Sequence, residues 1–257
     1  RDEMSYTHMC HDVLAFMNNK QLSNAVLIGH SMGGKVAKSL ALSYPNRIAG
    51  LVVLDIAPVT YTTADPAWKA VKGIIDSLRD VKIERGMTKR NVDRDLRATV
   101  EDPALRAFVL TNLDEGGGGG GGRIAGSSSN SKSNSSDAAD ADDTMLQWKI
   151  NINSISTQLD VIAGFDYLHS DDDSQSNGSS DGEDLLVNGS MSKSRIYEGD
   201  TFFINGGTSS FVKGKHMEVI SQYFPNYMLT TIRGSGHWVH AEAPDDTLAL
   251  LKRYLDR

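Results

Sequence analysis

Short apolar runs alternate with stretches of helical periodicity along most of the chain. Four runs predict buried strands, at residues 25–28, 51–54, 201–204 and 227–232. We expect the first to be covered on both faces, since its residues are all apolar. Amphipathic patterns predict helices at residues 6–17, 36–41, 217–224 and 246–255. Strands that alternate with helices indicate an α/β fold, with a mostly parallel sheet and helices on both faces.

A mostly helical region separates the second predicted strand from the third. Asp65-Pro66 and Asp102-Pro103 are helix-start signals, because aspartate caps a helix and proline suits its first turn. Apolar residues at helical spacing follow each signal, and the second set runs from Leu105 to Leu113. We interpret residues 57–168 as a helical cap or lid inserted into the sheet.

Two low-complexity segments, 115–144 and 169–195, interrupt this pattern. Their composition buries too little apolar surface to offset backbone entropy, so we expect disordered surface loops. The first contains the glycine run Gly116–Gly122, which lacks the preceding strand and following helix of a phosphate-binding loop. The predicted organisation is a core that begins with residues 1–56, the cap at 57–168, the acidic insert at 169–195, and a return to the core at 196–257.

Composition and charge narrow the class of protein. The 257 residues are 39% hydrophobic and 23% charged, which is ordinary for a globular chain. The net charge of −7 comes from residues 115–144 (−3) and 170–194 (−5), which leaves +1 for the rest. Without a basic stripe, we expect no nucleic-acid binding. No apolar run approaches the ~20 residues of a transmembrane helix.

The cysteine content and the first residue bear on localisation. A single cysteine, Cys10, excludes an internal disulfide and favours a reducing compartment. The chain begins at Arg1, so we expect the natural N-terminus, with any targeting signal, to be missing. The expected location is intracellular, either cytoplasmic or mitochondrial.

The segment Gly29–Gly33, "GHSMG", matches the G-x-S-x-G nucleophile elbow. A predicted strand precedes it and a predicted helix follows, as this motif requires. We expect Gly29 and Gly33 to be needed because a β-carbon would collide at the sharp turn, and Gly34 to let the helix pack closely. The turn exposes Ser31 as a nucleophile. The alternative is a structural turn with an incidental serine.

Two neighbours of the serine have expected supporting roles. The helix start favours negative charge, so the backbone N–H of Met32 is a natural oxyanion donor. His30 is expected to support the turn.

A serine nucleophile needs a base, and His237 is the favoured candidate. It follows the last predicted strand in "RGSGHWVHAE", where an α/β-hydrolase carries its histidine. His240 is the rival and is interpreted as a packed or capping residue. No metal is expected, because the other histidines show no ligand spacing: His8, His11, His169 and His216.

The base in turn needs an orienting carboxylate. The turn after the third strand, Thr208–Ser210, holds no acid. Asp55 stands at the end of the second strand, 24 residues after the serine, and is the predicted third member. The alternative role for Asp55 is a cap of the following segment. Asp160 and Asp166 are weaker candidates.

The elbow with its helix, "LTNL", "WKINI", "GGTSSFV" and "GSGHWVHAEAPDD" resemble one branch of the α/β-hydrolases. That branch contains alpha/beta hydrolase domain-containing protein 11 and related bacterial esterases, and the resemblance covers nearly everything outside the two inserts. It implies a triad of Ser31, His237 and Asp55, and hydrolysis of carboxylic esters or thioesters of acyl-lipid or acyl-CoA type. Some eukaryotic members are mitochondrial. Members carry further N-terminal strands and a second oxyanion donor, which we expect to be missing here.

The sequence thus predicts a serine hydrolase that works through an acyl-enzyme on a small acyl ester or thioester, without a cofactor. Two alternatives stay open. One is a catalytically impaired or non-catalytic hydrolase-like binding protein. The other is a cofactor-free acyltransferase or perhydrolase on the same triad.

Overall fold

The computed structural model describes residues 4–116, 145–165 and 196–257. The chain divides into two compact units, one formed by Arg1–Ala70 with Gln158–Arg257 and the other by Val71–Thr157. Most of both predicted inserts lies outside the described residues. Glu115 and Gly116, which composition alone places in the first insert, are the last residues of a strand. Within the described ranges, no helix is long and apolar enough to cross a membrane.

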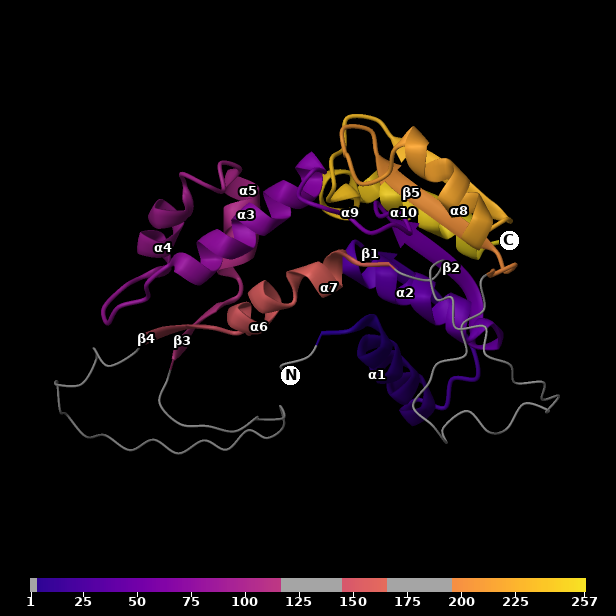
Figure 1. Ribbon diagram of the computed structural model, residues 1–257, viewed down its shortest axis with the longest axis horizontal. Coiled ribbons are helices and arrows are strands. Elements are labelled where there is room, and N and C mark those ends of the chain that lie inside the picture. Colours follow the sequence, from indigo (N-terminus) through magenta and orange to yellow (C-terminus); the bar gives the residue numbers. More distant parts are fainter. Residues whose placement is uncertain (1–3, 117–144, 166–195) are drawn as a thin grey trace, which may run out of the picture. The chain divides into compact units, whose positions relative to one another are not determined.

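The first unit is built on a sheet of four parallel strands in the order β1-β2-β5-β6. Strands β1, β2 and β5 are labelled in Figure 1. The strands are β1 (Ala25–His30), β2 (Ile48–Leu54), β5 (Thr201–Gly206) and β6 (Tyr227–Ile232). All four predicted strands are therefore present. Because they are parallel, their carboxyl ends meet at one edge of the sheet, which brings together loops that are distant in sequence.

Helices cover both faces of this sheet, as expected for an α/β fold. Helix α2 (Met32–Ser43) packs on β1 and β2, and α1 (Tyr6–Asn19) packs on α2. Gly50 of β2 faces the opposite side, toward Tyr254 of α10 (Pro244–Leu255). The remaining helical segments of this unit are η1 (Pro45–Arg47), α7 (Leu159–Ala163), η2 (Gly214–His216), α8 (Met217–Tyr223) and α9 (Val239–Glu242).

The core between the sheet and α10 is aliphatic and aromatic. Its fully or nearly buried members are Val52, Leu54, Phe202, Ile204, Ile232, Val239 and Tyr254. They come from β2, β5, β6, α9 and α10. This packing fixes β2 and β6, whose ends carry Asp55 and His237, together with β5 between them.

Strand β1 differs from its prediction. Val26 and Ile28 are 38% and 47% exposed, whereas Gly29 is buried. Their side chains lie on the sheet face opposite α2, so β1 is covered on one face and not on both. The apolar run correctly predicted a strand, but the prediction that both of its faces are buried was wrong.

The second unit has its own core. It contains most of α3 (Pro66–Asp80), then α4 (Lys89–Leu96), α5 (Pro103–Leu110), β3 (Leu113–Gly116), β4 (Met145–Trp148) and α6 (Ile152–Thr157). Its buried residues are Leu78, Val92, Leu96, Val109, Leu113, Leu146 and Ile152. The two predicted helix starts are correct, and Asp102 caps α5 by accepting from Ala104 N–H.

Leu113 is not part of the helix that the sequence predicts for it. Helix α5 ends at Leu110, and Leu113 begins β3, where it pairs with Trp148 of the antiparallel strand β4. The pairing partner lies beyond the first insert, so no local periodicity could reveal it.

Candidate active site

The chain turns sharply where β1 meets α2, and Ser31 is the residue at the turn. Its backbone has φ 51° and ψ −119°, a region that non-glycine residues rarely adopt. Its N–H donates to the carbonyl oxygen of Leu54 at 3.1 Å, which extends the β1–β2 pairing by one residue. Ser31 therefore stands at the carboxyl end of β1 in the strained conformation of a nucleophile elbow.

The glycines around Ser31 have unequal roles. A β-carbon on Gly29 would lie 2.4 Å from the carbonyl oxygen of Gly33, and one on Gly34 would lie 2.6 Å from Cγ2 of Ile56. Both positions therefore require glycine for the strand and helix to approach. A β-carbon on Gly33 would meet nothing within 4 Å. The expectation that Gly33 is needed to avoid a collision was wrong.

Asp55 occupies the equivalent place at the end of β2. Its φ is also 51°, and its N–H donates to the carbonyl oxygen of Ile204 at 2.9 Å. The residue is 1% exposed, so its carboxylate needs internal partners. Gly206 N–H donates to Oδ1 at 3.0 Å, and the Ser209 hydroxyl and a ring nitrogen of His237 contact Oδ2.

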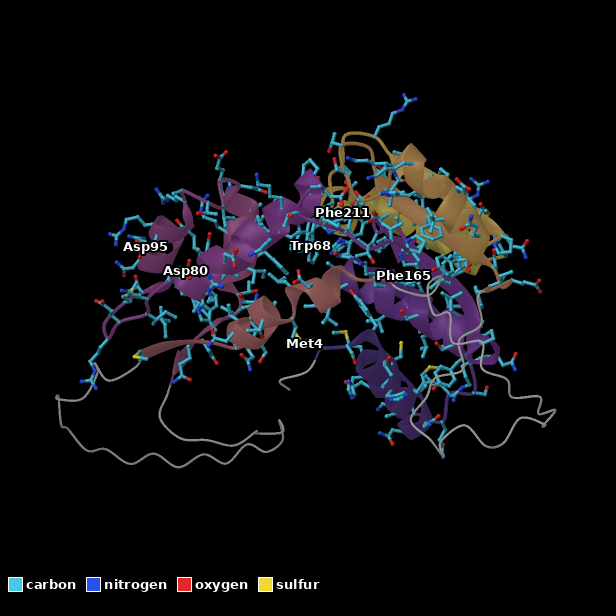
Figure 2. The ribbon with its side chains drawn as sticks, viewed as in Figure 1. Met4, Trp68, Asp80, Asp95, Phe165 and Phe211 are labelled. Atoms are coloured by element: carbon cyan, nitrogen blue, oxygen red, sulfur yellow. The ribbon has the colours of Figure 1, made fainter. Side chains whose placement is uncertain are left out.

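His237 links the other two residues. It lies on the loop between β6 and α9, and its Nδ1 is 2.7 Å from Oδ2 of Asp55 while its Nε2 is 3.0 Å from Oγ of Ser31. The imidazole side chain is 16% exposed. Phe211, labelled in Figure 2, follows β5 in sequence. Its ring centroid lies 4.1 Å from that of the imidazole. The structure thus brings Ser31, His237 and Asp55 together in hydrogen-bonding order.

His30 joins the elbow to the histidine loop. Its Nε2–H donates to the backbone oxygen of His237 at 2.8 Å. Burial, and then the charge that His237 can carry, lower the pKa of His30 to about 4, so its ring is neutral at pH 7. His240 is exposed on α9, and its ring centroid is 4.5 Å from that of His30. It is the ring of His237, rather than that of His240, that reaches Ser31.

The other predicted residues fall in different places. Met32 is the first residue of α2, where backbone N–H groups have no partner within the helix. Asp160 is exposed in the first turn of α7, and Asp166 lies outside the described residues. His169 also lies outside them. Across the described ranges, no three His, Cys, Asp or Glu residues form a metal-binding cluster.

Sequence reasoning missed part of the surroundings of Asp55 and His237. Gly206 is the last residue of β5, and Ser209 and Phe211 come from the segment after it, in which the sequence showed only the lack of an acid. The signal was the run of three hydroxyl residues, Thr208–Ser210, directly after the strand that neighbours that of Asp55. A buried carboxylate there needs donors, and serine supplies one.

Two buried lysines on α2 were also missed. Lys38 is fully buried and donates to the carbonyl oxygen of Ile56 at 2.9 Å, and burial holds the pKa of its amine well below the usual value. Lys35 donates to carbonyls at the end of α7, including that of Gly164 at 3.0 Å. These bonds tie α2 to the segment after Asp55 and to α7.

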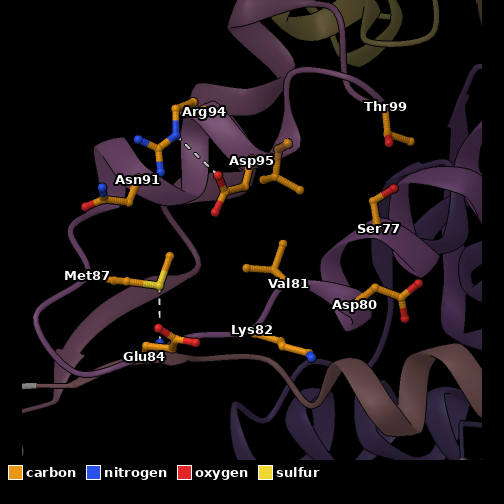
Figure 3. A pocket seen from close by; sticks show the side chains of 11 residues that line it. Ser77, Asp80, Val81, Lys82, Glu84, Met87, Asn91, Arg94, Asp95 and Thr99 are labelled. Carbon is orange, nitrogen blue, oxygen red and sulfur yellow. Dashed lines mark hydrogen bonds and ion pairs between the residues drawn. The ribbon is translucent and has the colours of Figure 1, made fainter.

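A separate hollow of about 610 Å³ lies in the second unit, between the end of α3 and α4 (Figure 3). Its lining is mainly polar, and Arg94 and Asp95 form an ion pair of 3.4 Å within it. None of the predicted site residues lines it. The candidate active site lies wholly in the first unit.

The chain is similar in sequence and fold to known hydrolases and esterases. A family model described as the alpha/beta hydrolase fold matches residues 1–85. A zebrafish (Danio rerio) protein named sn-1-specific diacylglycerol lipase ABHD11 is 29% identical over 98% of this chain and 63% of its own length. Escherichia coli esterase YbfF is 24% identical over 98% of this chain and 76% of its own length.

A solved structure titled "Marine microorganism esterase" superposes with a TM-score of 0.76 at 26% identity, covering 98% of this chain and 78% of that one. The resemblance to this branch of hydrolases and the α/β-hydrolase fold are therefore confirmed. The chain spans 63% to 66% of the length of the zebrafish, mouse and frog relatives that it matches.

Proposed function

We propose that this chain, which has the α/β-hydrolase fold, hydrolyses carboxylic esters with Ser31 as the nucleophile. The observation that carries the proposal is the relay from Ser31 Oγ through His237 to Asp55, with distances of 3.0 Å and 2.7 Å. A nucleophile, a base and an orienting acid in hydrogen-bond reach are the components that acyl transfer requires.

In the proposed first half-reaction, Ser31 Oγ attacks the acyl carbonyl carbon while His237 Nε2 takes the serine proton. The backbone N–H of Met32 stabilises the negative charge that develops on the carbonyl oxygen. Asp55 holds the Nδ1–H tautomer of His237 and stabilises the imidazolium. The imidazolium then protonates the leaving alcohol, and an acyl-enzyme remains.

In the second half-reaction, water attacks the acyl-enzyme and His237 accepts a proton from it. The carboxylic acid leaves as Ser31 regains its proton, so no cofactor takes part. Two relatives are named as a diacylglycerol lipase and an esterase, so glycerolipid and simple acyl esters are the first substrates to test. Acyl thioesters are the second class, because the same attack releases a thiol.

The decisive experiment is labelling of the folded chain with a fluorophosphonate, followed by mass spectrometry to locate the adduct. Phosphonylation needs an activated serine, so we expect the adduct on Ser31 and none in Ser31→Ala. The matched control is Ser210→Ala, which removes a nearby hydroxyl from the turn after β5 and should label normally. Hydrolysis of nitrophenyl esters should follow the same pattern.

An adduct that persists in Ser31→Ala would overturn the assignment of the nucleophile. A folded wild-type chain that gives no adduct and no hydrolysis would overturn the proposed activity, and would favour a hydrolase-like binding protein.

A further inference from the structure

The loop that carries His237 is held by its backbone as well as by the imidazole. The carbonyl oxygen of Ser235 accepts from both the N–H and the hydroxyl of Thr208, each at 3.0 Å. The loop lies directly on the end of β5, because a β-carbon on Gly206 would lie 1.9 Å from the oxygen of Gly236. These contacts fix the approach of the loop but do not set the direction of the His237 side chain.

The Glu242 carboxylate accepts hydrogen bonds from the backbone N–H groups on both sides of His237. Glu242 is the last residue of α9, which contacts β5 (Figure 1). It accepts from Gly236 N–H at 2.5 Å through Oε2 and from Trp238 N–H at 3.1 Å through Oε1. The two bonds therefore enclose His237, whose own carbonyl oxygen accepts from His30.

We propose that Glu242 is a positioning residue for His237, an inference that rests on the proposed function. The imidazole has to reach Asp55 and Ser31 at once, so its Cα position and backbone orientation must be fixed within a fraction of an ångström. Bonds from N–H groups to a carboxylate are stronger than those to a neutral acceptor. Glu242 supplies two of them to the residues that flank His237.

A purely structural role for Glu242 makes a different prediction. The bond to Trp238 N–H alone would suffice to cap α9, whose first residue follows Trp238. The bond to Gly236 N–H adds nothing to the helix, since Gly236 lies outside it. If Glu242 only caps α9, its removal should lower the stability of the protein. If Glu242 positions His237, its removal should also lower the rate of the chemical step.

The test compares Glu242→Ala and Glu242→Gln in the full chain with the control Asp245→Ala. Asp245 is an exposed acid nearby at the start of α10, so its removal matches the loss of charge. We expect Glu242→Ala to lower kcat on a nitrophenyl ester ~10- to 100-fold with KM nearly unchanged. Glu242→Gln keeps one acceptor oxygen and should recover a fraction of that loss. Asp245→Ala should match wild type.

Amide hydrogen exchange supplies a readout that does not depend on activity. The N–H groups of Gly236 and Trp238 should exchange faster in Glu242→Ala than in wild type or Asp245→Ala. A wild-type kcat in Glu242→Ala, or unchanged exchange at both amides, would overturn the inference. If the wild-type chain does not label at Ser31, the proposed function fails instead, and the exchange rates alone decide whether Glu242 holds the loop.

Discussion

Asp55 is the most constrained side chain of the candidate site. It is almost fully buried and accepts from Gly206 N–H and from the hydroxyl of Ser209, besides its contact with His237. A buried carboxylate with this many donors is held in one orientation. Its place was predictable because the sequence shows an acid directly after a buried strand. Its donors were not, since they come from the end of β5 and the turn after it, about 150 residues away.

We expect Asp55→Asn to lower kcat by ~10⁴, because an amide stabilises the wrong tautomer of the neighbouring imidazole. The variant should keep its shape, since asparagine has the same size and still accepts from Gly206. The measurement is kcat on a nitrophenyl ester together with the rate of labelling at Ser31. Asp200→Asn is the control, because Asp200 is exposed and far from the relay along β5. An unchanged kcat in Asp55→Asn would remove Asp55 from the proposed triad.

His30 should make the stability of the protein depend on pH. Its pKa is lowered to about 4 in the folded chain, whereas an exposed histidine has a pKa near 6.5. Between these values the unfolded chain binds a proton that the folded chain does not. The contribution of His30 to the free energy of unfolding is therefore fully present above about pH 6.5. It is lost as the pH falls toward 4, by at most ~1.4 kcal/mol per pH unit.

The matched variant is His30→Gln, which keeps an N–H donor for the His237 carbonyl but does not titrate. Urea unfolding at several pH values between 4 and 7 should give a flatter dependence for the variant than for wild type. Equal slopes would show that His30 does not carry this proton linkage.

At the scale of elements, the strands of the parallel sheet were predicted well and the shortest helices were not. The strand at residues 227–232 matches β6 at both ends. Helices α7 and α9 have five and four residues, little more than one turn, so they are too short to show the repeated apolar spacing that predicts a helix. The pair β3 and β4 was missed because the first insert separates its strands.

The elbow illustrates what a motif can and cannot specify. The G-x-S-x-G pattern located the turn, but it implied equal steric need for both of its glycines. In the structure, Gly29 and Gly34 allow the close approach of β1 and α2, whereas a β-carbon on Gly33 would meet no atom within 4 Å. Which glycine is crowded depends on tertiary packing, and that information is absent from the pattern.

This asymmetry makes a matched prediction for two alanine variants. Gly29→Ala forces a β-carbon against the backbone of Gly33 and Gly34, so we expect a loss of stability of at least ~1–3 kcal/mol and slower labelling of Ser31. Gly33→Ala places a methyl group in open space on a helix, where alanine is favoured over glycine by up to ~1 kcal/mol. Thermal unfolding and fluorophosphonate labelling of both variants measure the difference. Equal effects of the two substitutions would contradict the steric assignment.

At the scale of the whole molecule, the candidate site depends on one unit. Ser31 and Asp55 precede the second unit in sequence, and His237 follows it. A parallel sheet explains why residues 206 positions apart still meet, since β1, β2 and β6 all end at the same edge. This convergence was predictable from the parallel direction of the strands, which their alternation with helices indicates. The division at residues 70 and 157 was not, because it falls within or beside helices and not at a change of composition.

Separate cores predict that the two units lose structure separately. Leu96 is 1% exposed in the core of the second unit, and Ile204 is 0% exposed in the core of the first. Truncation of either to alanine removes buried methyl groups and should cost ~2–5 kcal/mol in the unit that contains it. If the two units open independently, each substitution should lower the free energy of opening only in the unit that contains it.

Amide hydrogen exchange followed by mass spectrometry distinguishes the two variants. Leu96→Ala should speed exchange in α4, α5 and β4 and leave the labelling rate of Ser31 within about twofold of wild type, because its cost falls on the second unit. Ile204→Ala should speed exchange in β2, β5 and β6 and slow labelling, because β5 supports Asp55 through the bond from Asp55 N–H to Ile204 O. If Leu96→Ala destabilises β2, β5 and β6 as strongly as α4, the two units unfold as one, and residues of the second unit contribute to the stability of the sheet that carries the candidate site.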